Sequence, residues 1–195
     1  MTDKTTPPCG KGPVRMIFTG GTIGSAGRPL APIGAAAFRA RWERHMAPRP
    51  GWEWLSPPID SAEMVPGDWA RIARLVLDAA EAGARGAVVL HGTDTLAQSA
   101  AALAMLLTLP GGAGRLAMPV AVTGSQRPLF DGEAIAEGTD AERNALDALA
   151  EAETGPPGVR LLFAGEALPG ARVTKRSSIE DRAFHCPNGP GEETR

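Results

Sequence analysis

Two stretches of sequence decide the fold, Val14-Arg15-Met16-Ile17-Phe18-Thr19-Gly20-Gly21-Thr22-Ile23-Gly24 and Ala87-Val88-Val89-Leu90-His91-Gly92-Thr93-Asp94-Thr95-Leu96. Each begins with a short apolar run typical of a buried strand and continues into a glycine-framed turn that carries threonine hydroxyls. Ligands of an open parallel sheet bind beyond the carboxyl ends of its strands, so both turns can face one site. The two stretches therefore predict a functional site around Thr22, Thr93 and Asp94.

The rest of the chain alternates apolar runs with amphipathic helical windows, which is the pattern of βαβ units. Strands are expected at 14–18, 87–90, 119–122 and 159–163. Helices are expected at 35–46, 69–82, 96–109 and 141–153. The Pro- and Gly-rich stretch 24–34 predicts a surface loop that could act as a lid. The fold class is therefore α/β, a three-layer, open, largely parallel sheet with helices on both faces.

The helix starts have their own signals. Asp68 is a plausible N-cap for the helix at 69–82. Capping boxes at 95–98 and 139–142 are expected to open the two later helices. Four prolines between 48 and 58 interrupt any long element before Ile59, so that segment is left unassigned.

Composition indicates one domain, because 195 residues with 43% hydrophobic content can bury a single core of ordinary size. We expect a disordered segment at 1–12, the α/β domain at 13–182 and a flexible tail at 183–195. The formal net charge of −2 gives no global field that would attract nucleic acid or an anionic membrane. A small molecule is therefore the expected partner.

The N-terminus lacks the apolar stretch of a signal peptide, and no run approaches the ~18 apolar residues of a membrane span. A cytoplasmic location is expected. The two cysteines, Cys9 and Cys186, fit neither a disulfide framework nor a zinc site and are interpreted as free thiols. The histidines show no metal-ligand spacing, so we expect neither a metal nor a cofactor.

Several segments together resemble the L-asparaginase family. Its three signature segments are similar to Thr19-Gly20-Gly21-Thr22-Ile23, His91-Gly92-Thr93-Asp94-Thr95-Leu96 and Val173-Thr174-Lys175. Its substrate-binding segment is similar to Asp60-Ser61-Ala62-Glu63-Met64, and the segment after its third signature strand to 122–128 with Asp140 and Asn144. The resemblance covers nearly the whole chain, and the six-residue segment at 91–96 is its most specific part.

The resemblance implies hydrolysis of the side-chain amide of L-asparagine to L-aspartate and ammonia, with no cofactor. Thr22 would attack the amide carbon and form an acyl-enzyme. Thr93, Asp94 and Lys175 would form a proton-relay group. Ser61 would bind the substrate α-carboxylate, Asp94 its α-ammonium and the backbone near Ser125 the amide end. The implied substrate-binding set is Gly21, Asp60, Ser61, Gly92, Thr93, Asp94 and Ser125.

Three departures from the family bear on this hypothesis. Family members carry a second, smaller C-terminal domain, so the resemblance is to a short-chain form. The family also places a tyrosine on the loop after the nucleophile, whereas this sequence contains no tyrosine. Ala62 stands where periplasmic members carry a substrate-binding glutamine. These departures predict weaker binding, and the subunit contacts of the family imply a homodimer or tetramer.

Each candidate residue has a structural alternative. Thr22 could simply end a strand, Thr93 and Asp94 could cap the following helix, and Lys175 could be a solvated charge between arginines. His91 is interpreted as a hydrogen-bonded structural histidine and not as a base.

Three other functions stay open at the level of sequence. The turn at 20–24 could cradle phosphate, but it has neither the Gly-x-Gly-x-x-Gly nor the P-loop pattern. A catalytically silent, asparaginase-like protein could bind an amino acid or a partner. Finally, four arginines between 39 and 49, near Trp42, Trp52 and Trp54, could bind RNA if the amide were tRNA-linked.

Overall fold

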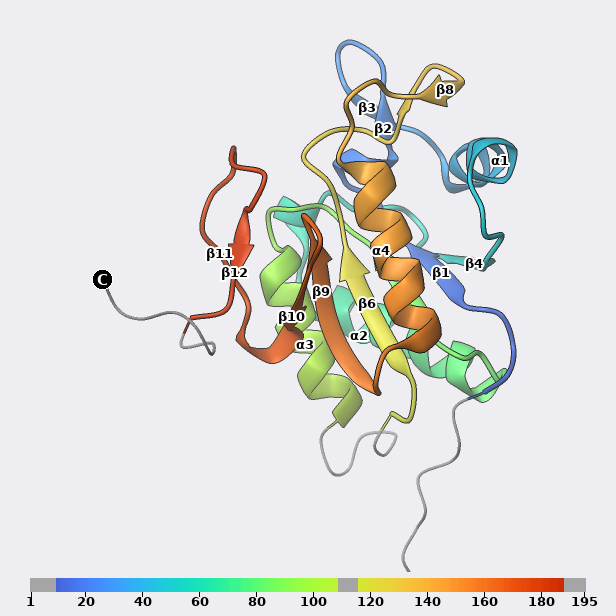
Figure 1. Cartoon of the computed structure of the whole chain (residues 1–195), viewed down its shortest axis with the longest axis vertical. Helices are drawn as coiled ribbons and strands as arrows, with labels where there is room; N and C mark the ends of the chain where they lie inside the picture. Colours follow the sequence, from blue (N-terminus) through green and yellow to red (C-terminus); the bar gives the residue numbers. More distant parts are fainter. Residues whose placement is uncertain (1–9, 109–115, 188–195) are drawn as a thin grey trace, which may run out of the picture.

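A six-stranded, largely parallel sheet forms the centre of the computed structural model, which describes residues 10–108 and 116–187. Its strand order is β10-β9-β6-β5-β1-β4, and only the edge pair β9 and β10 is antiparallel (Figure 1). The strands are β1 (Arg15–Phe18), β4 (Gly51–Trp54), β5 (Ala87–Leu90), β6 (Pro119–Thr123), β9 (Gly158–Phe163) and β10 (Glu166–Pro169).

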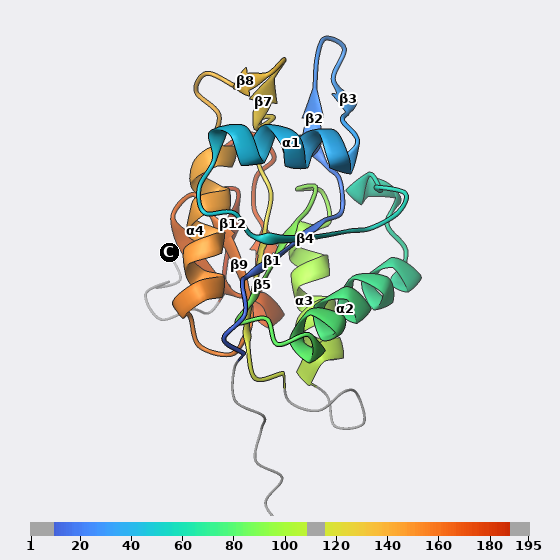
Figure 2. The same ribbon diagram turned by 90° about the vertical axis from the view of Figure 1, so that its right-hand side faces the viewer.

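Helices cover both faces of this sheet. They are α1 (Ala35–His45), α2 (Pro66–Glu81), α3 (Leu96–Thr108) and α4 (Ala141–Thr154). In Figure 2, α4 lies on one side of the sheet and α2 and α3 lie on the other. Neighbouring residues of β5 enter different cores: Val89 packs in the cluster beneath α2 and α3, and Val88 packs in the cluster that includes α1 and α4. The expected three-layer fold is therefore confirmed.

Three short hairpins and three single turns complete the described chain. The hairpins are β2 (Ser25–Ala26) with β3 (Ala31–Pro32), β7 (Phe130–Asp131) with β8 (Ala134–Ile135), and β11 (Thr174–Lys175) with β12 (Phe184–His185). The single 3-10 turns are Thr22–Gly24, Ser61–Glu63 and Gly170–Arg172. Figure 1 shows the β2–β3 and β7–β8 hairpins projecting together beyond the carboxyl end of the parallel strands.

The four expected strands and four expected helices are all present, but some details differ. Residues 24–34 form the β2–β3 hairpin rather than a plain loop. The segment with the many prolines contains the edge strand β4. Helix α2 begins at Pro66, three residues before the expected start, because proline is tolerated at the first helical position. Asp68 lies inside the first turn and accepts a hydrogen bond from the Val65 N–H at 3.1 Å.

The two expected capping boxes differ from the prediction. The N-cap of α4 is Asp140, whose side chain makes no capping hydrogen bond, and the Thr139 hydroxyl before it accepts from the Ala141 N–H at 3.1 Å. The Thr95 hydroxyl instead donates to the Ser61 carbonyl at 2.8 Å and so connects the start of α3 to the turn after β4.

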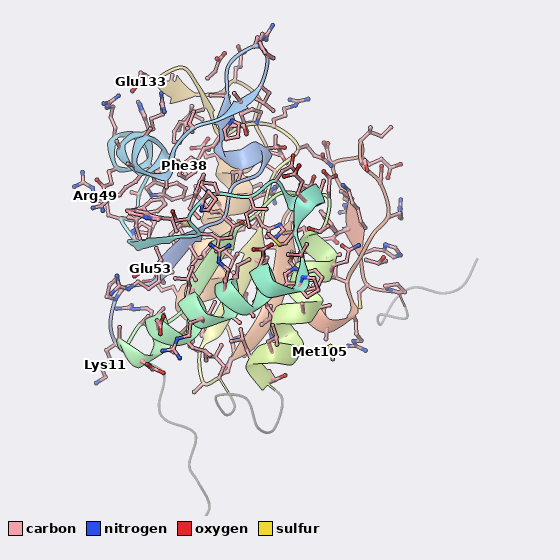
Figure 3. All side chains as sticks on the ribbon, turned by 180° about the vertical axis from the view of Figure 1, so that it is seen from behind. Lys11, Phe38, Arg49, Glu53, Met105 and Glu133 are labelled. Atoms are coloured by element: carbon pink, nitrogen blue, oxygen red, sulfur yellow. The ribbon has the colours of Figure 1, made fainter. Side chains whose placement is uncertain are left out.

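Helix α1 is fastened to the β7–β8 hairpin by charged side chains. Glu133, at the hairpin tip, pairs with Arg41 at 2.7 Å and Arg44 at 2.6 Å. Figure 3 shows Glu133 beside α1 and Phe38 directed from α1 toward the sheet. The hydrogen bond from Arg44 is the main reason that the pKa of Glu133 lies below its ordinary value.

These contacts also bear on the RNA-binding alternative. Trp42 is fully buried and Trp52 is nearly so, with their rings 5.8 Å apart in an edge-to-face arrangement. Their ring faces are thus used in the core and cannot stack on bases. Arg39 pairs with Glu43, so three of the four arginines already have carboxylate partners.

Parts of the expected boundaries lie outside the described residues. These are most of the segment 1–12 with Cys9, the end of the third helix at 109, and residues 188–195 of the tail. Within 183–187 the structure contains β12, and Cys186 is a free thiol. Among the described helices, none has the length and apolar character needed to cross a bilayer.

Candidate active site

The turns after β1 and β5 touch each other at the carboxyl edge of the sheet. The Thr19 hydroxyl donates to the Leu90 carbonyl at 2.8 Å. A Cβ atom added to Gly21 would lie 2.4 Å from the Cα and N atoms of Gly92, and Gly21 has a φ of +84°. Only glycine allows this backbone approach. The arrangement brings Thr22 and Thr93 to the same opening.

The segment after β4 forms a third wall. The Ile59 N–H donates to the Thr19 carbonyl at 2.8 Å, which fixes the segment to the first turn. Asp60 accepts from the Ala62 N–H at 3.0 Å and so caps the short turn that carries Ser61. A Cβ added to Gly92 would lie 2.4 Å from the Ser61 Oγ, so the second and third turns are also in direct contact.

The three turns enclose a cavity of about 230 Å³. Thr22 is half-buried at its wall, Thr93 is buried, and the Asp94 side chain is 62% exposed at its mouth. Of the predicted site residues, those that line the cavity are Gly21, Thr22, Asp60, Ser61, Gly92, Thr93 and Asp94.

Lys175 reaches this site from β11, 81 residues further along the chain than Asp94. Its Nζ lies 3.1 Å from Asp94 Oδ1, and the lysine side chain is only 16% exposed. The structure thus brings Lys175 to Asp94, although Lys175 is not among the described residues that line the cavity. The charged groups near the mouth of the cavity are therefore the carboxylates of Asp60 and Asp94 and the ammonium group of Lys175.

Ser125 is placed differently. It is buried in the turn after β6, outside the set of described residues that line the cavity, and its hydroxyl donates to the Arg127 carbonyl. Asp140 holds this turn by accepting from the N–H groups of Gln126 at 2.8 Å and Arg127 at 3.0 Å. Asn144 donates to the Gly124 carbonyl at 3.0 Å.

The sequence did not identify an apolar part of the cavity wall. Leu30 and Pro32 come from the β2–β3 hairpin, and Pro58 and Ile59 come from the segment after β4. Ser25 also lines the cavity and donates to the Gly21 carbonyl at 3.1 Å, which connects the hairpin to the turn that carries Thr22. Pro–Gly patterning predicted an irregular loop here but gave no signal for which residue faces the site.

His91 lies fully buried behind the second turn. Its Nδ1 is 2.7 Å from the Gly92 carbonyl oxygen, and its Nε2 is 2.9 Å from Ser99 Oγ and 3.2 Å from Met64 Sδ. Burial lowers the pKa of His91, and the bond to the Gly92 carbonyl opposes that shift. The imidazole is therefore neutral near pH 7, in line with the structural interpretation of this residue.

The described residues contain no cluster of three or more His, Cys, Asp or Glu side chains arranged to hold a metal ion.

Comparison with known families gives a match to the model "Asparaginase, N-terminal" over residues 13–192. The chain belongs to the asparaginase family. Membership of this family supports an amidohydrolase.

Individual relatives agree with this assignment. The asparaginase-family chain is 34% identical over 185 residues to L-asparaginase 1 of Escherichia coli K12, covering 91% of this chain and 51% of the relative. The solved thermostable L-asparaginase of Thermococcus kodakarensis superimposes with a TM-score of 0.74 at 31% identity, covering 91% of this chain and 52% of that one. This chain thus spans about half the length of these two relatives.

A third relative carries a different name. It is a component of the glutamyl-tRNA(Gln) amidotransferase of Haloquadratum walsbyi and is 39% identical over 119 residues, which cover 58% of this chain and 25% of the relative. The family is therefore established, and it includes proteins that are named for different substrates.

Proposed function

We propose that this chain hydrolyses the side-chain amide of L-asparagine to L-aspartate and ammonia through a covalent ester on Thr22. The observation that carries the proposal is the meeting of Thr22, Thr93 and Asp94 in one small cavity, with Lys175 on Asp94. A volume of about 230 Å³ suits a small amino acid better than a macromolecule. Two carboxylates near the mouth favour a ligand with an ammonium group.

The first half of the reaction forms the ester. The Thr22 oxygen attacks the amide carbon, and its proton passes to the departing nitrogen, which leaves as ammonia. The carbonyl oxygen becomes an oxyanion during the attack. The backbone N–H groups of the Gly92–Thr93 turn are the candidate donors to this oxygen, and loss of one such donor typically costs about 3 kcal/mol of barrier.

The second half hydrolyses the ester. Water attacks the same carbon, the Thr22 oxygen regains its proton, and aspartate leaves. In this proposal Thr93, Asp94 and Lys175 relay the protons of both halves, since the Lys175 ammonium already donates to Asp94 at 3.1 Å. Ser61 and Asp94 hold the α-carboxylate and α-ammonium of the substrate. Asp60 supports Ser61 through its cap on the turn.

The proposal extends to assembly and location. We expect a homodimer or tetramer, because the Asp94 side chain is 62% exposed and the site is open on that side. Sedimentation velocity of the active protein would test this, and an active monomer would contradict it. We also propose that the protein is cytoplasmic. A structural neighbour from Campylobacter jejuni, 25% identical to this chain, is named as a probable cytoplasmic L-asparaginase.

The test is ammonia release from L-asparagine and L-glutamine, with hydroxylamine present to trap the ester as a hydroxamate. We expect ammonia and aspartyl hydroxamate from the wild type and neither from Thr22→Ala. Thr123→Val is the matched control, because it removes a buried threonine hydroxyl that bonds to the Leu162 carbonyl and does not line the cavity. It should lower stability by about 1 kcal/mol and retain turnover.

Other outcomes would redirect the proposal. Activity that persists in Thr22→Ala would remove Thr22 as the nucleophile. Folded wild-type protein that releases no ammonia from either amide would favour the catalytically silent binding protein. Release from glutamine alone would change the substrate and leave the mechanism in place.

A further inference from the structure

One half-buried indole and three buried polar groups form a connected chain behind the second turn. The Trp69 indole N–H donates to Ser99 Oγ at 2.9 Å, Ser99 Oγ is 2.9 Å from His91 Nε2, and His91 Nδ1 is 2.7 Å from the Gly92 carbonyl oxygen. Trp69 comes from α2, Ser99 from α3 and His91 from the end of β5. The chain therefore joins two helices to the turn that carries Thr93.

The direction of every hydrogen bond in this chain follows from its two ends. An indole N–H can only donate, and a carbonyl oxygen can only accept. His91 Nδ1 must therefore carry the proton that binds the Gly92 carbonyl. In a neutral imidazole this leaves Nε2 as an acceptor, and the Ser99 hydroxyl, which already accepts from Trp69, donates to it. Tautomer and ring orientation are fixed together.

Fixing the Gly92 carbonyl also fixes the amide that follows it. The Gly92 C=O and the Thr93 N–H belong to one planar trans peptide unit and point in opposite directions. With the carbonyl held toward buried His91, the Thr93 N–H is turned away from it. Gly92 and Thr93 both line the cavity, so an N–H of this turn is available to a bound ligand.

From this geometry we infer that His91 is a positioning residue that directs the Thr93 N–H toward the reacting carbonyl. Ser99 and Trp69 fix the tautomer and the ring orientation of His91 through their hydrogen bonds. The inference rests on the proposed function, because it needs an oxyanion for the amide to meet. His91 itself is fully buried and is not among the described residues that line the cavity. Met64 Sδ lies 3.2 Å from His91 Nε2 and 3.5 Å from Ser99 Oγ. With the Ser99 proton directed to Nε2, the thioether packs against both atoms and accepts a hydrogen bond from neither.

Kinetics of single variants test the inference. His91→Leu removes the donor to the Gly92 carbonyl, and we expect kcat to fall about 10- to 100-fold with KM within about threefold, the pattern of a misaimed transition-state donor. His91→Asn places an amide N–H close to the Nδ1 position, and kcat should recover by at least about fivefold relative to His91→Leu. Ser99→Ala and Trp69→Phe should lower kcat about 3- to 10-fold.

Trp42→Phe is the matched control for Trp69→Phe. Trp42 also donates through its indole nitrogen, to the Pro48 carbonyl at 3.2 Å, but it packs in the cluster on the other face of the sheet. It should lower the unfolding midpoint and keep kcat within about twofold of the wild type. Equal losses of kcat in the two Trp→Phe variants would overturn the inference, as would an Asn variant no better than the Leu variant.

A second measurement does not depend on activity or on variants that fold. Long-range proton–nitrogen NMR of wild-type protein with labelled histidine reports which ring nitrogen carries the proton. We expect His91 in the neutral Nδ1–H form, and the Nε2–H form would overturn the inference. If the wild type releases no ammonia but shows the Nδ1–H form, the proposed function fails while the fixed peptide orientation stands.

Discussion

At the scale of single residues, His91 links stability to pH. Burial lowers its pKa below the ordinary histidine value of 6.5. As pH falls below 6.5, His91 binds a proton in the unfolded chain but stays neutral in the folded chain. The unfolded state then holds more protons, so the free energy of unfolding falls with decreasing pH, by up to about 1.4 kcal/mol per pH unit for one group.

Urea unfolding of the wild type and His91→Asn at pH 7.5 and 5.5 measures this contribution. The other ionisable groups are the same in both proteins, so their contributions cancel in the difference. The wild type should lose more stability than the variant between the two pH values. Parallel pH profiles would show that His91 titrates alike in the folded and unfolded chain.

The predictability of the site differs from residue to residue. Thr22, Thr93 and Asp94 could be predicted because strand ends of a parallel sheet meet at one edge. Lys175 could not be placed from the chain alone, since 81 residues separate it from Asp94, and only the family resemblance singled it out. The role of Ser99 depends on a contact with Trp69, 30 residues away, which no local pattern encodes.

At the scale of elements, the site depends on how closely the strand-end turns approach. In Gly21→Ala the new Cβ would meet backbone atoms of Gly92 at 2.4 Å, and backbone cannot yield as a flexible side chain does. The turns must separate, which displaces Thr22 from Thr93. We expect kcat/KM to fall at least about 100-fold, since a misplacement of about 1 Å can cost that much.

Gly83→Ala separates this clash from backbone strain. Gly83 has a φ of +77°, close to that of Gly21, but an added Cβ there meets nothing within 4 Å. The substitution should cost about 1 kcal/mol of stability and leave steady-state kinetics unchanged. If Gly21→Ala were as active as Gly83→Ala, the close approach of the two turns would be unimportant for the site.

Elements with strong periodicity were predicted well, and weakly patterned ones were not. The apolar run of β5 and the amphipathic face of α2 each bury residues at the spacing that their geometry demands. The edge strand β4 alternates Trp and Glu next to prolines, so its signal resembles that of a loop. The two-residue strands β2 and β3 are too short for any period, and pairing with each other defines them.

At the scale of the whole molecule, one sheet holds two apolar layers together. β5 contributes Val89 to the layer under α2 and α3 and Val88 to the layer under α1 and α4. The fold class could be predicted because alternating βαβ units leave a parallel sheet with both faces to cover. The antiparallel edge strand β10 was not predicted, since it follows β9 through a tight turn in which Ala164 has a φ of +51°.

Because the layers share the sheet, damage on either side should unfold the molecule as one unit. Phe38 is fully buried in one layer beside Trp42 and Trp52, and Leu103 is fully buried in the other. Phe38→Ala should lower the free energy of unfolding by about 3–5 kcal/mol, and Leu103→Ala by about 2–5 kcal/mol. Tryptophan fluorescence and far-UV circular dichroism should give coincident urea transitions for both variants.

Comparing Phe38→Ala with Leu103→Ala tests whether the two apolar layers unfold together. Trp42 and Trp52 report on the layer that Phe38→Ala damages, whereas Trp69 lies on α2 over the opposite face. If α1 and its hairpin melted separately, Phe38→Ala would show a fluorescence change at lower urea than the loss of helix, while Leu103→Ala would not. That outcome would mean that α1 unfolds independently of the sheet, and the β2–β3 hairpin that precedes it could then move without unfolding the site.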